Sequence, residues 1–421
     1  MRKLLAGIVC ACIAIALAMA TVCTWSMHMR ADTARLYAER ENALSLVGDD
    51  AAKYRGLTWT REAAKHGALM FFGSSELSST VPPVIKSFFP NVQLRRNISC
   101  SGRAHMQNFE HALAIGANSE ALHDADIVIF ESLQWFFGDD IPIDGFMANF
   151  SEQHFQEFLN NPRISTAAKT YACKRFLALE KRRTSENIRT DVPESIKTYK
   201  IFRAREKTLD YPQTHLLARS YLDHTFMGNV IAFGMQPYFA ARGTLLRLKD
   251  EYAAWQAMRN ADPYFKRPLF DCRWQEKFTA ANALGERTAS HNPIHADDIF
   301  FKEHVEKNWD NLKDSSKGAT ALVSREWDDY VFLLGVCREL GLTPYIVLLP
   351  TNGHYYDHVG VDPKMRQLFY QRNAQTAYDY GIPVFSGMKD REYEHFLFYD
   401  EIHLSQKGWL YVAKAIIEHF K

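Results

Sequence analysis

The sequence lacks any excess of charge of one sign, and it has no metal-binding cysteine motif. Its 421 residues carry 50 Lys and Arg against 49 Asp and Glu, so net charge gives no reason to expect a nucleic acid partner. No cysteines are paired as Cys-x-x-Cys or spaced as in a zinc site. We therefore expect neither a metal nor a cofactor. A hydrophobic content of 47% and an aromatic content of 13% exclude general disorder.

Cysteines are also too few and too scattered to define a disulfide framework. Three of the seven lie in the apolar N-terminal run, and the other four are Cys100, Cys173, Cys272 and Cys337. One or two disulfides remain open in an oxidising compartment. Cys337 sits in an apolar helical pattern, which predicts a buried thiol.

The N-terminus carries the clearest topological signal. Arg2 and Lys3 precede an uncharged run over residues 4–25, which as a helix at about 1.5 Å per residue would span the ~30 Å hydrocarbon core of a membrane. The basic residues favour a cytoplasmic N-terminus with the rest of the chain outside, although Arg30 weakens the asymmetry. We predict a membrane anchor over residues 1–27. A cleaved signal peptide with its small-residue site at 18–20 is the alternative.

The remaining chain predicts one α/β domain with an insertion. Residues 28–65 are charged and alanine-rich and predict a helical stalk before a domain over residues 66–421. Residues 150–300 are rich in basic helical patterns and predict a helical insertion. Strands and helices alternate elsewhere, which favours a mainly parallel sheet covered on both faces. Strands are expected at 67–72, 91–94, 126–130, 345–349 and 382–385, and helices at 81–89, 106–122, 324–340, 364–380 and 404–420.

A serine, a histidine and an aspartate lie where such a sheet would place its site. Ser74 and Ser75 follow an apolar run and a glycine, and Asp400 precedes His403 by three residues. Sites in open α/β sheets collect beyond the carboxyl ends of the strands. There His403 would serve as the base for a serine nucleophile, with Asp400 orienting its ring. Ser75 is the preferred nucleophile, because Ser74 suits the role of a helix cap.

Acyl transfer also needs donors for a developing oxyanion. The backbone N–H groups of Ser75 and Gly102 and the side-chain amide of Gln134 are the candidates. Each motif has a structural alternative: an Asp-x-x-His is often a helix cap or a surface pair, and Gln134 would also suit a satisfied core amide.

Taken in order, these motifs resemble the SGNH/GDSL hydrolase superfamily and, more closely, the DltD family of D-alanyl transfer proteins. The resemblance runs over nearly the whole exported part and implies an SGNH-like three-layer fold. The stretches that carry it are Phe72-Gly-Ser-Ser-Glu-Leu77, Ser132-Leu-Gln-Trp-Phe136, Asn292-Pro293, Ser324-Arg-Glu-Trp-Asp-Asp329, Pro350-Thr-Asn-Gly-His-Tyr-Tyr-Asp357, Asp400-Glu-Ile-His403 and Lys407-Gly-Trp409.

The resemblance implies roles for single residues. Ser75 matches the nucleophile, Asp400 and His403 complete its triad, and Gly102 and Gln134 match the oxyanion donors. The family pattern is altered beside these positions, and the changes bear on substrate detail more than on reaction type. They are Leu133 for proline, Thr351 for valine, Tyr355 for tryptophan and Ser405 for glycine.

The implied function is a membrane-anchored, extracytoplasmic O-acyltransferase. D-alanine from a carrier pathway and a membrane-bound acyltransferase partner would pass through Ser75 to a lipid-linked teichoic acid or similar anionic polymer. Asn352, Gly353, His354 and Tyr355 are candidates for lining the acceptor groove, or else form a tight turn with packed aromatic rings. Two other functions remain open: an exported esterase or thioesterase that uses water, and a non-catalytic scaffold for the D-alanylation machinery. The apolar stretch 225–238 would touch the membrane or the partner, or form a buried helix, which we favour.

Overall fold

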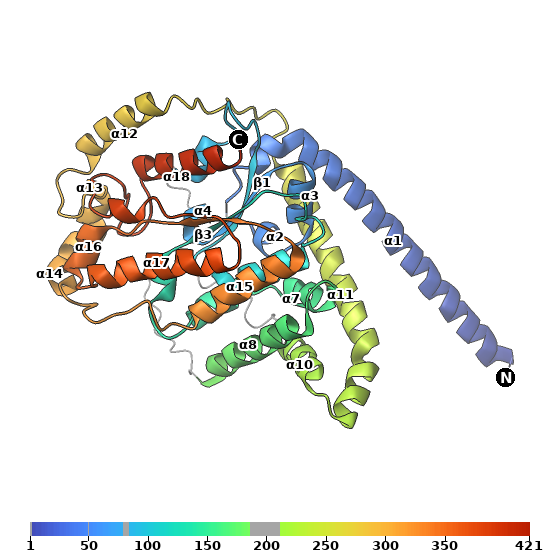
Figure 1. The fold of residues 1–421 in the computed structure, drawn as a ribbon. Helices are drawn as coiled ribbons and strands as arrows, with labels where there is room; N and C mark the ends of the chain where they lie inside the picture. Colours follow the sequence, from blue (N-terminus) through green and yellow to red (C-terminus); the bar gives the residue numbers. More distant parts are fainter. Residues whose placement is uncertain (1, 49, 79–83, 186–210) are drawn as a thin grey trace.

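A five-stranded parallel sheet lies at the centre of the computed structural model (Figure 1), which describes residues 2–48, 50–78, 84–185 and 211–421. Its strand order is β2-β1-β3-β4-β5, and every neighbouring pair is parallel. The α/β class and the parallel sheet are therefore confirmed. The strands are β1 (Leu69–Gly73), β2 (Ile98–Gly102), β3 (Ile127–Glu131), β4 (Tyr345–Leu348) and β5 (Val384–Phe385).

Helices cover both faces of this sheet, which makes the predicted three layers. Strand side chains alternate between faces, and β1 shows the result: Met70 and Phe72 belong to one buried apolar cluster, while Leu69 and Phe71 belong to another. The first cluster includes residues of α5 (Asn108–Ala117), α15 (Glu326–Leu340) and α17 (Pro363–Asp379). The second includes the apolar face of α18 (Gln406–His419).

Two predicted elements near the second strand are wrong. Residues 91–94 form a turn, in which the Asn91 side chain accepts the N–H groups of Gln93 and Leu94 at 3.1 and 2.9 Å. Asparagine competes for backbone donors in this way and favours turns. The strand begins later, at Ile98. The helix expected from residue 81 is only a 3-10 turn at Ile85–Phe88, and residues 79–83 lie outside the described chain.

The other strands and the helices after the insertion are present with small shifts of their ends. Gly341 ends α15 in the left-handed conformation, with a φ of 71°, as its predicted capping role requires. Ser405 caps the start of α18: its Oγ accepts the N–H of Lys407 at 3.1 Å. This cap fixes the end of the loop that carries Asp400 and His403.

The described part of the chain between β3 and α15 is mostly helical. Residues 186–210 of the predicted insertion lie outside the described chain. The helices are α6 (Ile143–Asn149), α7 (Glu152–Asn160), α8 (Thr166–Ser185), α10 (Tyr211–Leu222), α11 (Phe226–Asn260), α12 (Trp274–Thr288), α13 (Asp298–Phe300) and α14 (Trp309–Leu312).

The buried helix that we favoured at 225–238 is wrong. These residues begin α11, and its first turns expose large apolar side chains: Phe226 is 80% exposed and Phe233 is 83% exposed. An exposed apolar segment of this kind is typical of a surface that meets a membrane or another protein.

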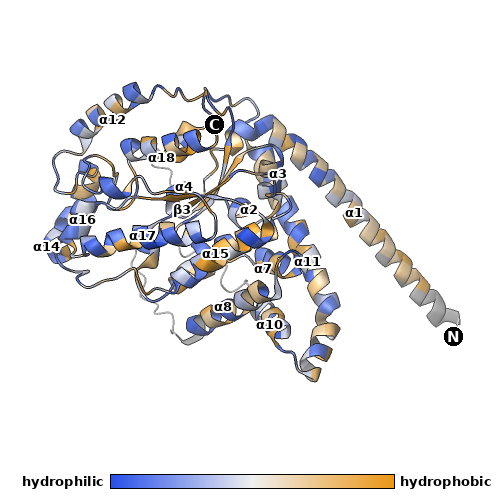
Figure 2. Cartoon of the chain, viewed as in Figure 1, coloured by the Kyte–Doolittle hydropathy of each residue, from blue (hydrophilic) through white to orange (hydrophobic). Residues whose placement is uncertain are grey.

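The N-terminal helix α1 (Arg2–Leu44) extends away from the rest of the fold (Figure 1), and its outer part is apolar (Figure 2). It contains a stretch, Cys12–Leu44, that is long and apolar enough to cross a membrane. Its second half packs on the fold: Ser26 donates to Glu251 of α11 at 2.6 Å, and Trp255 donates to Asp32 at 2.7 Å. The predicted stalk region therefore contains the packed end of α1, followed by α2 (Ala51–Tyr54) and α3 (Thr58–Lys65).

All seven cysteines are free. The disulfides left open by the sequence do not form, and Cys337 is buried as predicted.

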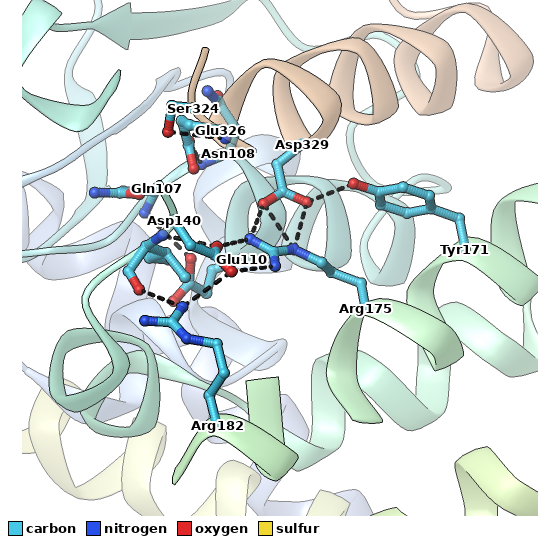
Figure 3. Close-up of polar contacts among 11 residues, drawn as sticks. Gln107, Asn108, Glu110, Asp140, Tyr171, Arg175, Arg182, Ser324, Glu326 and Asp329 are labelled. Atoms are coloured by element: carbon cyan, nitrogen blue, oxygen red, sulfur yellow. Dashed lines mark hydrogen bonds and ion pairs between the residues drawn. The ribbon is translucent and has the colours of Figure 1, made fainter. Parts of the chain in front are cut away.

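A buried ionic network joins the helical insertion to the sheet layers (Figure 3). Arg175 of α8 contacts Asp329 of α15 at 2.6 Å and also pairs with Asp140. Tyr171 donates to Asp329 at 2.8 Å, and Glu326 accepts the N–H of Asn108 at 3.0 Å. The family-like stretch around Asp329 thus has a structural role. Burial raises the pKa of Glu326 well above its ordinary value.

We expect Arg175→Ala to destabilise the fold by about 3–5 kcal/mol, because it leaves Asp329 buried without its counter-ion. Arg273→Ala is the control, since the Arg273 side chain is 64% exposed and its ion pairs with Asp271 and Glu276 lie on the surface, where each pair contributes about 1 kcal/mol or less. Chemical denaturation of the detergent-solubilised chain measures both. Equal losses in the two variants would contradict a stabilising role for the network.

Candidate active site

Ser75, His403 and Asp400 form a continuous chain of hydrogen bonds. The Oγ of Ser75 lies 2.8 Å from Nε2 of His403, although 328 residues separate them. The Nδ1 of His403 lies 2.6 Å from a carboxylate oxygen of Asp400. The structure therefore brings together the three residues that the sequence placed at opposite ends of the domain.

Local structure holds each member of this chain. Ser75 is the first residue of the short helix α4 (Ser75–Ser78), and only Ser74 separates it from the end of β1. The other oxygen of Asp400 accepts the N–H groups of Ile402 and His403, at 2.8 and 2.5 Å. Tyr399 donates its N–H to the carbonyl of His403 at 2.8 Å, which closes the loop. Asp400 thus fixes its own loop and the imidazole together.

Ser74 has a different environment from Ser75. Its hydroxyl is buried and donates to the carbonyl of Arg103 at 3.2 Å. Its N–H donates to a carboxylate oxygen of Glu76 at 2.6 Å. Only the hydroxyl of Ser75 bonds to His403, which supports Ser75 as the nucleophile.

The charges around His403 favour its protonated form. Burial alone lowers the pKa of His403, but the hydrogen bond to Asp400 and the charges of Asp400, Glu76 and Glu401 outweigh burial and raise it. Burial raises the pKa of Glu76 and of Glu401. Sequence reasoning assigned no role to these two glutamates. The sequence signal for them was adjacency: Glu76 follows Ser75, and Glu401 follows Asp400.

Besides the N–H of Ser75, the two other candidate oxyanion donors come from the carboxyl edge of the sheet. Gly102 ends β2 and pairs with Gly73, the last residue of β1. A Cβ on Gly102 would lie 2.7 Å from the carbonyl oxygen of Gly73, so only glycine permits this approach. Gln134 lies in the 3-10 turn Leu133–Phe136, directly after β3. β1 lies between β2 and β3, so the two donors flank the strand that leads to Ser75.

The four groove candidates divide into two pairs at α16 (Gly353–His358). Asn352 is buried and caps this helix: its Oδ1 accepts the N–H of Tyr355 at 3.2 Å, and its Nδ2 donates to the carbonyl of Ile294 at 2.9 Å. Gly353 packs so closely that a Cβ would lie 2.8 Å from the Tyr393 ring. These contacts favour the tight-turn interpretation for Asn352 and Gly353. His354 and Tyr355 are partly exposed.

His354 also belongs to a cluster that sequence reasoning missed. Ring nitrogens of His295, His354 and His395 lie within 4.8 Å of one another. The three residues are far apart in the sequence and match no metal-binding spacing, so no local signal predicted their meeting.

A cavity of about 470 Å³ lies elsewhere, between α2, α7 and α11. None of the predicted site residues lines it. This cavity therefore does not coincide with the hydrogen-bond chain of Ser75, His403 and Asp400.

Comparison with known proteins agrees with these motifs. A family model described as DltD protein matches residues 50–421. The chain belongs to the DltD family. It is 26% identical over 360 residues to Protein DltD of Bacillus subtilis (strain 168), covering 84% of this chain and 82% of that protein.

Two further DltD proteins are similar to this chain. Protein DltD of Staphylococcus aureus (strain NCTC 8325 / PS 47) is 29% identical over 151 residues, covering 36% of this chain and 38% of that protein. Protein DltD of Lacticaseibacillus rhamnosus is 21% identical over 383 residues, covering 86% of this chain and 79% of that protein. The DltD resemblance inferred from the motifs is thus confirmed.

We expect Gly102→Ala to cost about 1–3 kcal/mol of stability and to reduce activity, because the new methyl group must push the β1 backbone away. Gly335→Ala in α15 is the control, since its Cβ would meet nothing closer than the Tyr380 ring at 3.9 Å. Alanine favours a helix interior over glycine, so this variant should be neutral or stabilised. Thermal unfolding compares the two, and an undisturbed Gly102→Ala would contradict the close approach.

Proposed function

We propose that this chain is a serine-dependent O-acyltransferase that transfers D-alanyl groups to a teichoic acid or a similar anionic envelope polymer. DltD proteins take part in the D-alanylation of teichoic acids, and this chain belongs to that family. The observation that carries the catalytic proposal is the hydrogen-bond chain from Ser75 through His403 to Asp400. A hydroxyl with a base and an orienting acid in this geometry is equipped for nucleophilic acyl transfer.

In the first step His403 takes the proton of Ser75 as Oγ attacks the carbonyl carbon of an activated D-alanyl donor. The backbone N–H groups of Ser75 and Gly102 and the amide of Gln134 would stabilise the oxyanion. The leaving group departs with the proton from His403, and D-alanine remains as an ester on Ser75.

In the second step a hydroxyl of the polymer occupies the position that the leaving group vacated. This hydroxyl gives its proton to His403 as its oxygen attacks the carbonyl carbon of the ester on Ser75. The bond to Ser75 breaks, and Oγ regains the proton. Water would give a hydrolase by the same route, so the transferase proposal requires that the polymer hydroxyl reach the ester in preference to water.

We further propose that α1 anchors the chain in the membrane, with the N-terminus in the cytoplasm and the remaining domain outside. The length and apolar character of α1 and the exposed Phe226 and Phe233 on α11 support a membrane-bound location. There the chain would meet the lipid-linked polymer, the membrane-bound acyltransferase partner and the D-alanine that the carrier pathway supplies. Tethering to one surface raises the effective concentration of all of them.

Ser75→Ala should reduce ester-linked D-alanine on the envelope to the level of a deletion strain, because it removes the attacking oxygen. Ser74→Ala is the control: it should keep most activity and lose about 1 kcal/mol of stability with its hydrogen bond to Arg103. Ester-linked D-alanine is measured after mild alkaline release, with chain levels checked by immunoblot.

Full D-alanylation with Ser75→Ala would exclude the catalytic proposal and favour a scaffold. Mass spectrometry of the trapped active-site peptide tests the covalent step separately. Release of free D-alanine from acyl-Ser75 at equal rates with and without polymer would instead indicate a hydrolase.

The pH dependence of transfer should follow the ionisation of His403. Its raised pKa keeps the base protonated to a higher pH than a free imidazole, at about 6.5, so the rate should rise with pH through a value above that point. Asp400→Asn removes the first group that raises this pKa. The midpoint should then move down while the maximal rate falls by orders of magnitude. An unchanged midpoint in this variant would contradict the assignment.

A further inference from the structure

Three histidines meet beside the loop that carries the candidate base. His295 lies in the loop before α13, His354 is in α16, and His395 lies eight residues before His403. α13 and α16 are neighbours in the fold (Figure 1), and Asn352 joins their two segments through the carbonyl of Ile294. The cluster therefore connects three separate segments at one point.

The spacing of their nitrogens is close to that of a metal site. One ring nitrogen of each histidine lies within 4.8 Å of the others. Zinc binds histidine nitrogen at about 2.0–2.1 Å with tetrahedral geometry, which places ligand nitrogens roughly 3.3 Å apart. Small side-chain rotations would bring the histidine nitrogens from their present spacing to the spacing of a zinc site. The rings of His295 and His395 are stacked with centroids 3.6 Å apart, so this stack would open as a metal enters.

The hydrogen bonds around the cluster leave nitrogens available for ligation. The Nδ1 of His295 is buried and has no hydrogen-bond partner among the described residues. Nε2 of His354 lies 3.4 Å from the carbonyl of Tyr393, so Nδ1 would be its ligand atom in the proposed site. Ligating histidines commonly direct their second nitrogen at a backbone carbonyl in this way.

The surroundings also hold the backbone of the cluster in place. Lys407 donates to the backbone carbonyl of His395 at 2.9 Å. His295 has a φ of 51°, an uncommon conformation that persists only where surrounding structure holds it.

We propose that His295, His354 and His395 bind one divalent transition metal ion of the zinc type. Three imidazoles would fill three positions of a tetrahedral site, and the exposed side of His395 leaves the fourth open to water. The ion would cross-link the loop before α13, the start of α16 and the loop that leads to Asp400 and His403. The proposal concerns this cluster alone and does not depend on the acyl-transfer chemistry of Ser75.

Zinc binding by the full chain in detergent tests this proposal. The chain carries no polyhistidine tag and is first stripped with a chelator. After zinc is added back and the excess is removed by desalting, we expect it to retain about one zinc ion per molecule. Its thermal unfolding midpoint should rise as zinc is added to the stripped chain. His354→Gln and His395→Gln should each weaken zinc binding by roughly tenfold or more and lose the rise. His224→Gln is the control, because His224 is exposed and outside the cluster.

Cobalt substitution gives a readout specific to the ligands. Co²⁺ in a tetrahedral site absorbs visible light, and this band should be present in the parent chain and absent in both cluster variants. His395 is exposed, so its variant should keep the parent circular dichroism spectrum and isolate metal binding from folding. No retained zinc in the parent chain, or equal retention by the parent and His395→Gln, would overturn the proposal.

Discussion

The parallel pairing of β1 with β2 and β3 is the constraint on which the candidate site depends. It aligns the carboxyl ends of three strands at one edge, where Gly102 ends β2 and Ser75 and Gln134 follow β1 and β3 within three residues. Gly73 and Gly102 pair so closely that neither backbone leaves room for a side chain on Gly102. The proposed nucleophile and one proposed oxyanion donor are therefore positioned by the backbone register of neighbouring strands.

The base reaches Ser75 by a different means. The loop of Asp400 and His403 is closed by its own hydrogen bonds, but its position depends on α18. That helix packs on one face of the sheet. There the ring of Trp409 lies edge-on to the ring of Phe130 of β3, with ring centroids 6.2 Å apart. Packing of α18 against the sheet thus holds His403 opposite Ser75, so the last helix of the chain supports the candidate site although it contributes no side chain to the hydrogen-bond chain.

Features that depend on local sequence could be predicted, whereas features that depend on the packing of distant segments could not. Ser75, Asp400 and His403 are each set by local patterns, namely a strand followed by a glycine and a short polar loop, so their motifs were recognisable. The turn at Asn91 and the exposed face of α11 were mispredicted, because short apolar runs do not distinguish a strand from a turn or a buried helix from an exposed one. The role of Asp329 was also hidden, since its partner Arg175 lies in an insertion whose packing no periodicity describes.

The sequence did not predict the histidine cluster either, because its three residues come from separate segments. The position of His395 in the loop limits which part of the loop a bound metal ion would affect. His395 lies at the start of the segment that leads to Asp400 and His403. At the end of this segment, Ser405 and Lys407 donate to the backbone carbonyls of Phe396 and His395. The loop is therefore already closed by protein contacts before any metal binds. A metal ion would add a second closure at the outer end, while the hydrogen bonds of Asp400 continue to orient His403. Metal binding should for this reason alter the stability of the loop more than the geometry between His403 and Ser75.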